Sequence, residues 1–229
     1  MSLLINLRNV SKDYGGTVKA LESVNLEIDK GEFVFIVGPS GAGKSTLIKL
    51  LYREEVPSKG QVVVLGKDLA KLRRREVPYL RRRIGVVFQD FKLLEEKTVW
   101  ENVSFALEVT GTPNREIRKR VSQVLTLVGL KDRRDAFPNE LSGGEQQRIA
   151  IARALARNPD ILLADEPSGN LDPKTSLEIF SLLERANMYG TTVVVATHAQ
   201  EMVNLFKKRV IELRNGTVVR DERRGAYSS

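Results

Sequence analysis

The sequence predicts an α/β fold with a parallel β-sheet at its centre. Short runs of β-branched and aromatic residues alternate with segments of helical periodicity along the 229 residues, which is the pattern of βαβ units. Two of these runs, at residues 33–37 and 161–164, are apolar throughout, as the inner strands of a parallel sheet are. A glycine-rich loop at residues 38–45 directly follows the first run and completes the order strand, loop and helix.

The expected strands share this apolar, β-branched character. In chain order they span residues 4–10, 24–28, 33–37, 61–65, 84–88, 161–164 and 192–196, followed by a hairpin over residues 210–219. The dipeptide Asn215-Gly216 at the centre of the hairpin indicates a type I′ turn, because both residues tolerate a positive φ.

The segment between the fifth and sixth strands is helical in character. Thr98 and Glu101 have the spacing of a capping box, which opens a helix. Residues 111–114 break that helix, and a second one follows, in which Ile117 and Val121 recur at helical spacing. We expect this segment to form a small helical subdomain inserted into the α/β core.

The composition excludes several classes of site. The chain is 41% apolar and contains no cysteine, so it has no disulfide framework, no thiolate metal site and no cysteine nucleophile. Its longest apolar runs have the length of strands, whereas a membrane span needs ~20 residues. Asn6 and Arg8 interrupt the N-terminal segment, which therefore lacks the apolar core of a signal peptide. We expect a cytoplasmic protein.

The net charge of +8 is concentrated in two stretches. Residues 71–83 carry seven basic and one acidic side chain, and residues 115–134 carry seven basic and two acidic ones. One interpretation is a solvated helix face, because the second stretch is also amphipathic. Alternatively, the basic residues are attracted to anionic lipid headgroups or to an acidic partner surface, and each Lys or Arg would then contribute about 1 kcal/mol to binding. Binding of nucleic acid comes third.

The loop at residues 38–45 matches the pattern G-x-x-x-x-G-K-[ST] in full. Its glycines allow successive backbone N–H groups to point inward around phosphates, and the following helix adds the positive end of its dipole. Lys44 is expected to reach the β- and γ-phosphates, and the Ser45 hydroxyl to ligate Mg²⁺. The strand, the spacing, the lysine and the serine agree, so the motif predicts a nucleotide site rather than an empty glycine-rich turn.

Two adjacent carboxylates, Asp165 and Glu166, follow the apolar strand at residues 161–164. These acids lie at the carboxyl end of a parallel strand, beside the loop at residues 38–45, which we call the phosphate loop. There Asp165 can hold Mg²⁺ while Glu166 orients or deprotonates an attacking water. By itself such a pair is more often a solvated turn, and the loop at residues 38–45 is what favours the functional interpretation.

A second helix start suited to phosphate occurs at residues 141–145. Ser142 and the two glycines after it expose free N–H groups and the positive dipole end, which suit an anion. Alone, this pattern would be an ordinary N-cap. One chain with two such cradles raises the question of what the second one binds.

Together these motifs resemble those of the ATP-binding-cassette ATPases over nearly the whole chain. The loop at 38–45 is similar to Walker A, residues 162–166 to Walker B with the catalytic glutamate, and residues 141–145 to the family signature. The resemblance implies a P-loop NTPase fold with a RecA-like parallel-sheet core, an N-terminal antiparallel β-subdomain and the inserted helical subdomain. It divides a single domain, 1–229, into core and β-subdomain at about 1–89 and 155–229, and helical subdomain at about 90–154.

The resemblance also implies roles for single residues. Tyr14 matches the aromatic residue that stacks on adenine, Gln89 the Q-loop glutamine, and His198 the switch histidine, while residues 168–172 resemble the D-loop. The residues expected to be catalytic are Lys44, Gln89, Glu166 and His198, and those expected to bind Mg²⁺ are Ser45, Gln89 and Asp165. The residues expected to bind ATP are Tyr14, Gly38, Pro39, Ser40, Gly41, Ala42, Gly43, Lys44, Ser45, Thr46, Gln89, Ser142, Gly143, Gly144, Glu145, Asp165 and Asp172.

The second cradle has an explanation in this family, where two copies pack head to tail. The signature of one copy closes over the ATP that the phosphate loop of the other copy holds. The resemblance therefore implies a homodimer with ATP at its interface.

Within the family, residues 51–55, 77–90, 137–140 and 210–222 resemble the cell-division subfamily called FtsE. This implies a place on the cytoplasmic face of the bacterial cell membrane, beside an FtsX-like integral membrane protein that controls cell-wall hydrolases, with other divisome proteins as further partners. The contact with the membrane protein is expected near residues 89–100. Ala199 departs from the pattern, because many relatives carry an acid there.

Three alternatives remain open. The ATPases of lipoprotein-releasing and macrolide-type exporters share the Walker, signature and D-loop residues. A DNA-associated ATPase of this family usually carries a long coiled coil between phosphate loop and signature, for which this chain has no room, and we expect no nucleic-acid partner. A regulator that binds nucleotide without hydrolysing it is disfavoured by the presence of Glu166 and His198.

Overall fold

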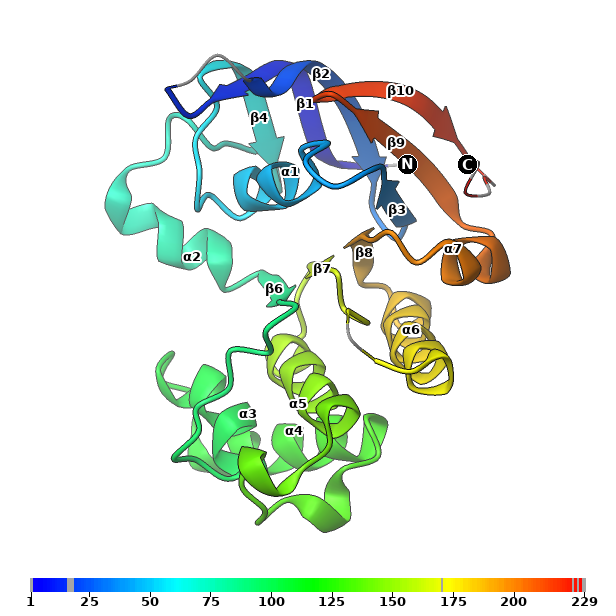
Figure 1. Cartoon of the computed structure of the whole chain (residues 1–229). Helices are drawn as coiled ribbons and strands as arrows, with labels where there is room; N and C mark the ends of the chain where they lie inside the picture. The colour runs from blue at the N-terminus through cyan, green and yellow to red at the C-terminus, as the bar shows by residue number, and fades with distance from the viewer. Residues whose placement is uncertain (1, 16–18, 170, 224, 226, 228–229) are drawn as a thin grey trace.

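The computed structural model describes residues 2–15, 19–169, 171–223, 225 and 227. Within these ranges the chain forms a six-stranded sheet, a four-stranded sheet and a separate group of helices. Figure 1 shows the four-stranded sheet at the top and the group of helices at the bottom. None of the described helices has the length and hydropathy that crossing a bilayer requires.

The six-stranded sheet is parallel except at one edge. From edge to edge its strands are β10 (Thr217–Glu222), β9 (Arg209–Arg214), β3 (Phe33–Val37), β8 (Thr192–Ala196), β7 (Ile161–Asp165) and β6 (Ile84–Val87). Among these strands only β10 runs antiparallel to its neighbour, across a turn in which Asn215 and Gly216 have φ values of 49° and 76°. The predicted parallel sheet and hairpin are confirmed. The carboxyl ends of β3, β8, β7 and β6 meet along one edge.

The four-stranded sheet is antiparallel throughout. Its order is β2 (Lys19–Asp29), β1 (Leu3–Asp13), β4 (Lys59–Val64) and β5 (Lys67–Asp68). Strands β1 and β2 extend beyond the predicted residues 4–10 and 24–28, because their pairing continues across several register shifts. The sheet meets the β9–β10 hairpin through the Glu22 N–H, which donates to the Gly216 carbonyl at 2.8 Å.

Strand β3 divides its side chains between two hydrophobic cores, and all five of its residues are buried. Val34 and Ile36 pack with the four-stranded sheet. Phe35 faces the other way, where its ring lies 5.9 Å from that of Phe180. Burial on both faces explains why this strand lacks polar alternation. The flanking helices are α1 (Lys44–Leu51) on the first side, and α6 (Pro173–Met188) and α7 (Gln200–Phe206) on the second.

The middle of the chain forms the group of helices. Thr98 opens the first of them as predicted, because its hydroxyl accepts from the Glu101 N–H at 3.2 Å and the Glu101 carboxylate accepts from the Thr98 N–H at 2.9 Å. The helices are α3 (Val99–Glu108), α4 (Asn114–Leu127) and α5 (Gly143–Leu155), and α5 also packs on β6. Short elements nearby are η1 (Arg74–Glu76), α2 (Val77–Arg81), η2 (Lys131–Arg133) and η3 (Pro138–Glu140).

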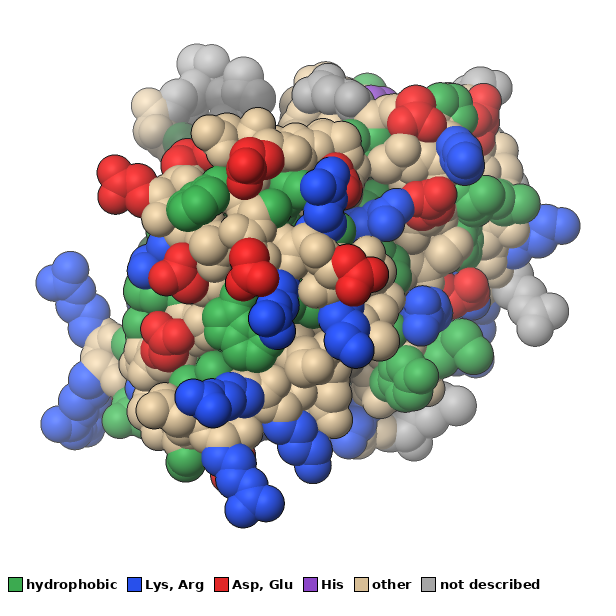
Figure 2. Space-filling view, turned by 90° about the horizontal axis from the view of Figure 1, so that it is seen from below, with side chains coloured by type: hydrophobic (Ala, Val, Ile, Leu, Met, Phe, Trp, Pro, Cys, Tyr) green, Lys and Arg blue, Asp and Glu red, His purple; other side chains and the backbone are tan. Residues whose placement is uncertain are grey.

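Helix α4 carries much of the second basic stretch. Ile117, Val121 and Val124 are buried, whereas Arg118 and Lys119 are exposed. In the view from below, onto the group of helices, acidic side chains lie among the basic ones in the upper and central part, and basic side chains predominate along the lower edge (Figure 2). This arrangement agrees with the interpretation of a solvated helix face.

Candidate active site

The phosphate loop connects β3 to α1, and its shape requires glycine at two positions. A Cβ at Gly38 would lie 2.1 Å from the carbonyl oxygen of Leu213 on β9, and one at Gly43 would lie 2.4 Å from that of Ala20 on β2. Both glycines have a positive φ, 141° and 103°, a region that other residues rarely enter. The loop therefore lies so close to β9 and β2 that only glycine fits.

Lys44, the first residue of α1, is buried inside the curve of this loop. Its ammonium donates to the carbonyl oxygens of Gly38 at 2.8 Å and Pro39 at 3.1 Å, and the residue is only 8% exposed. A buried cation beside neutral carbonyls suits an anionic ligand. The N–H groups at the start of α1 lack helical partners and favour an anion at the same place.

Asp165 lies at the carboxyl end of β7, next to the start of α1. It forms a hydrogen bond with the Ser45 hydroxyl, while its buried Oδ1 has no hydrogen-bond partner among the described residues. Burial raises the pKa of Asp165 and the neighbouring Glu166 charge raises it further, whereas the Ser45 hydrogen bond and the Lys44 charge act in the opposite direction. A buried carboxylate oxygen without a partner is suited to a cation.

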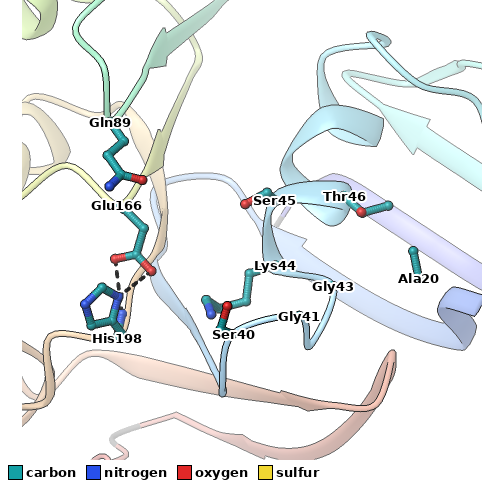
Figure 3. A pocket seen from close by; sticks show the side chains of 10 residues that line it. All are labelled: Ala20, Ser40, Gly41, Gly43, Lys44, Ser45, Thr46, Gln89, Glu166 and His198. Atoms are coloured by element: carbon teal, nitrogen blue, oxygen red, sulfur yellow. Dashed lines mark hydrogen bonds and ion pairs between the residues drawn. The ribbon is translucent and has the colours of Figure 1, made fainter. Parts of the chain in front are cut away.

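Glu166 has a backbone conformation that is rare outside glycine, with a φ of 47°. Its N–H donates to the Ala196 carbonyl at 2.9 Å, which ties this strained residue to β8. Its carboxylate Oε1 lies 2.8 Å from the ring nitrogen Nδ1 of His198, and its Oε2 accepts from the backbone N–H of His198 at 3.3 Å (Figure 3). The His198 side chain is 70% exposed, so the pair is open to a ligand.

These segments enclose a cavity of about 600 Å³. Gln89, two residues after β6, lies next to Glu166 on the side of the cavity opposite the phosphate loop (Figure 3). Gly169 lies against it, since a Cβ there would be 3.0 Å from the Gln89 amide nitrogen. The structure thus brings together residues that lie far apart in the sequence. The lining residues are Ala20, Ser40, Gly41, Gly43, Lys44, Ser45, Thr46, Gln89, Glu166 and His198.

The donor set at this cavity fits Mg²⁺. Ser45 and Gln89 line the cavity with a hydroxyl and an amide. Asp165 is not among the lining residues, but it is a hydrogen-bond partner of Ser45 and supplies a carboxylate whose Oδ1 has no partner among the described residues. Mg²⁺ prefers such oxygen ligands and is usually held by one or two carboxylates together with water and phosphate oxygens. A cage of three or more His, Cys, Asp or Glu side chains does not occur in the part of the chain that the structure describes.

Ala20 lines the cavity although nothing in its sequence context marks it. It belongs to β2, and its carbonyl is the atom that a side chain at Gly43 would strike. An alanine in a half-buried strand carries no chemical signal, so only the packing of the four-stranded sheet against the phosphate loop could have identified it.

Several predicted site residues do not line this cavity. Tyr14 is 54% exposed, and the Lys12 ammonium lies 4.7 Å from the centre of its ring. Asp172 caps α6 by accepting from the Thr175 N–H at 3.0 Å. Asn170, within the predicted D-loop, lies outside the described residues. Their roles toward a nucleotide stay predictions.

The signature segment forms the N-terminus of α5, as predicted, and is separate from the cavity of its own chain. The Ser142 hydroxyl accepts from the Glu145 N–H at 3.3 Å, and the Glu145 carboxylate accepts from the Ser142 N–H at 2.9 Å. The Ser142 N–H and the Ser142 hydroxyl both donate to the Glu145 carboxylate, and these two hydrogen bonds lower its pKa. Gly144 is pressed against α6, since a Cβ there would lie 2.5 Å from Cγ2 of Thr175.

Known proteins resemble this chain over nearly all of its length. A sequence model of the ABC transporter family matches residues 21–169. The cell division ATP-binding protein FtsE of Bacillus subtilis is 57% identical over 226 residues, 99% of each chain. That of Mycobacterium tuberculosis is 54% identical over 226 residues, 98% of each chain. The dimeric ATP-binding cassette MJ0796 in a post-hydrolysis state, bound to ADP and Pi, is 41% identical and superimposes with a TM-score of 0.88 over 98% of this chain and 100% of its own. The predicted fold class is confirmed.

Proposed function

The chain belongs to the ABC transporter family of ATPases and, within it, to the cell division ATP-binding proteins of the FtsE type, and from this premise we propose that it drives a membrane complex in bacterial cell division. It is an ATPase, converting ATP and water to ADP and phosphate. The convergence of Lys44, Gln89, Glu166 and His198 on one cavity carries the hydrolytic part of the proposal, and the 57% identity to the FtsE of Bacillus subtilis carries the role in cell division.

The chain's own residues divide the work of hydrolysis. The phosphate-loop N–H groups and Lys44 bind and orient the β- and γ-phosphates, because phosphoryl transfer is catalysed mainly by positioning and charge stabilisation. Glu166 orients the attacking water and accepts its proton. His198 holds the Glu166 carboxylate through the 2.8 Å contact, and Gln89 completes the side of the cavity opposite the phosphate loop.

We assign the Mg²⁺ that accompanies ATP to Ser45, Gln89 and Asp165. When bound, the ion neutralises charge that develops on the phosphate oxygens. The unpartnered Oδ1 of Asp165 supports this assignment, because a buried carboxylate oxygen is costly without a cation or a hydrogen-bond donor.

Two copies of the chain are proposed to act together, with ATP between them. The relative MJ0796 is dimeric, and the helix N-terminus at Ser142 is built for an anion but lies outside the cavity of its own chain. In a head-to-tail pair, the Ser142 and Gly144 N–H groups of one copy would face the triphosphate held by the other. ATP then stabilises the closed pair and hydrolysis releases it.

The membrane partner is proposed to bind beside the Gln89 segment, and this contact would hold the chain at the cytoplasmic face of the membrane. A groove of about 650 Å³, here called the docking groove, lies there between α2, β6, α3 and α5. Of the predicted contact residues 89–100, Lys92 lines this groove, whereas Val99 is fully buried and Trp100 packs against the core. The docking groove is lined by Tyr52, Pro78, Arg81, Arg82, Ile84, Gly85, Val86, Phe88, Lys92, Ala106, Val109, Thr110, Arg153, Ala154, Arg157 and Pro159.

The test combines turnover with capture from membranes. Tagged wild type and the Glu166→Gln variant are incubated with solubilised membranes of the source cells, with and without ATP. Loss of the general base should slow hydrolysis roughly 10²–10⁴-fold, while ATP binding persists and the closed dimer accumulates with an FtsX-like membrane protein attached. Lys44→Ala, which weakens phosphate binding, is the matched control and should give no ATP-dependent dimer.

Two outcomes would revise the proposal differently. Unchanged turnover in Glu166→Gln would remove Glu166 from its assigned role. Capture of a lipoprotein-releasing or macrolide-type exporter would keep the ATPase and replace the role in cell division.

A further inference from the structure

The docking groove has an apolar floor that is only partly open to solvent, because Val86 and Phe88 are half-buried whereas Tyr52 and Ile84 are buried. Tyr52, Ile84, Val86 and Phe88 form the side next to β6, and Val109 on the α3 side faces them. Val109 is 59% exposed, which is unusual for an aliphatic residue in a concave surface. A floor of this kind fits apolar side chains of another chain.

Five basic side chains surround this floor, with no acidic residue among those that line it. They are Arg81, Arg82, Lys92, Arg153 and Arg157. No ion pair links any of them to a carboxylate among the described residues, where other arginines such as Arg83 and Arg209 have carboxylate partners at 2.7 Å. The groove thus concentrates positive charge that forms no direct ion pair in the described part of the chain, where the Glu54 carboxylate beside it accepts from the Tyr52 hydroxyl instead.

The groove cations are held in place by neutral groups instead. Arg81 donates to the carbonyls of Tyr52 and Arg53, each at 3.1 Å. The Arg82 guanidinium lies 4.7 Å from the ring centre of Tyr79. Such contacts fix the positions of the side chains and leave their charge available to a ligand.

The backbone at Lys92 is held by another cation of the groove. Phe91 and Lys92 both have positive φ values, 54° and 49°, and the Arg153 guanidinium holds their carbonyls at 2.8 Å and 2.6 Å. The Lys92 ammonium then lies 4.6 Å from the ring centre of Phe88, at the floor of the groove. Burial lowers the pKa of Arg153 and Arg157, and the Arg82 charge also lowers that of Arg157, so the clustered charge carries a cost that a carboxylate would offset.

We infer that the docking groove recognises an amphipathic acidic segment of the membrane partner, with apolar side chains on the floor and at least one Asp or Glu between Arg82 and Lys92. The inference rests on the proposed function, because it specifies the partner that binds beside Gln89. Charge complementarity selects this occupant: an apolar segment would leave five cations without counter-charge, and a basic one would be repelled.

The test reverses the charge at two groove residues that take no part in hydrolysis. Arg82→Glu with Lys92→Glu should lower capture of the membrane partner about tenfold or more, since like charges across an interface are strongly unfavourable. Its ATPase activity without membranes should equal that of wild type. Arg82→Lys with Lys92→Arg keeps both charges and should keep capture, as should the matched reversal Arg115→Glu with Arg118→Glu on the exposed side of α4.

A charge swap then identifies the acidic residue of the partner that binds the groove cations. Once the captured chain is sequenced, changing the acidic residue of its cytoplasmic segment to lysine should abolish binding to wild type and restore it to the reversed variant. Equal capture by wild type and reversed variant would overturn this inference alone. Capture of no membrane chain by wild type would overturn the proposed function and this inference with it. Binding of phosphatidylglycerol vesicles that depends on Arg82 and Lys92 would assign the groove to lipid headgroups instead.

Discussion

Asp165 and Glu166 are neighbours in the chain, but the structure gives their carboxylates different environments. Asp165 is turned toward α1, where burial raises its pKa and the Ser45 hydroxyl is its partner. Glu166 continues from β7 with a positive φ, and its carboxylate meets His198 in the open cavity. One carboxylate is therefore suited to a metal ion and the other to water, because a buried oxygen without a partner favours a bound cation, whereas a carboxylate that lines the cavity can be reached by water.

Replacing Asp165 by asparagine should stabilise the empty protein while removing its activity. A raised pKa means that the folded state binds the Asp165 proton more tightly than the unfolded chain does. The contribution of this carboxyl to stability is therefore fully present at acidic pH and is lost as the pH rises through the raised pKa. Asparagine carries no charge to bury, so the melting temperature of the variant at neutral pH without nucleotide should rise, by about 2–4 °C for each ~1 kcal/mol.

Thermal melts of wild type and Asp165→Asn from pH 3 to pH 8 would measure the change in melting temperature. Mg²⁺-dependent ATPase assays would measure the loss of activity, which should exceed about a hundredfold for a metal ligand. Full activity in the Asp165→Asn variant would contradict the assignment of Asp165 to the metal site. A lower melting temperature of that variant at neutral pH would contradict the environment described for the carboxyl.

At the scale of elements, two helices begin with the same capping box, and only one of them is placed to meet a ligand. Thr98 and Glu101 open α3, and Ser142 and Glu145 open α5, with the same reciprocal hydrogen bonds. The α3 start is held in the group of helices by the Val99 N–H, which donates to the Ala136 carbonyl at 2.9 Å. The α5 start instead offers Ser142, which is exposed.

Alanine at each cap should separate the structural role of a cap from the functional one. Thr98→Ala and Ser142→Ala should each lower the free energy of unfolding by about 1 kcal/mol, because each leaves a helix N–H without its side-chain acceptor. Only Ser142→Ala should also weaken ATP-dependent dimerisation and turnover. Urea unfolding and ATPase assays on the two variants give the comparison. Equal loss of activity in both would show that the effect comes from folding.

At the scale of the whole molecule, each chain carries two helix starts suited to an anion, and they do not meet within it. The cavity gathers the phosphate loop, Gln89, Glu166 and His198, whereas the Ser142 helix start lies in the group of helices. A pair related by a two-fold axis would bring each helix start against its complement twice. The arrangement therefore accounts for both cradles with a single assembly.

Mixing two inactive variants should restore activity if this pairing is correct. Lys44→Ala lacks a working phosphate loop. Gly143→Asp places an acid opposite the triphosphate, and the fold should tolerate it, because a Cβ there has ordinary contacts at 3.5 Å or more and an acid suits a helix N-terminus. Each variant alone should be inactive. A mixture should recover up to about a quarter of the wild-type rate, since half of randomly formed pairs are mixed and each mixed pair has one intact site.

ATPase rates across mixing ratios would follow a curve with its maximum near equal amounts. A mixture as inactive as its components, under conditions where capture of one tagged variant recovers the other, would contradict the head-to-tail arrangement.

The sequence alone determined those parts of the protein that depend on local patterns. The apolar runs predicted the inner strands, the Asn215-Gly216 pair predicted the hairpin turn, and Thr98 with Glu101 predicted the start of α3. The phosphate loop could be identified because its glycines, lysine and serine lie within eight residues. Hydrogen bonding, turn geometry and helix capping act over a few residues, so their signals are present in the chain order itself.

Tertiary structure decided which of these parts meet. Ala20 enters the cavity because β2 packs on the phosphate loop, and His198 reaches Glu166 because β7 and β8 are neighbours in the sheet. Of the groove cations without an ion pair, Arg81 and Arg82 belong to the basic stretch at residues 71–83, but only the fold of the described chain brings Lys92, Arg153 and Arg157 beside them. Strand order and helix packing are set by the burial of apolar surface over the whole chain, and that burial has no short-range signature.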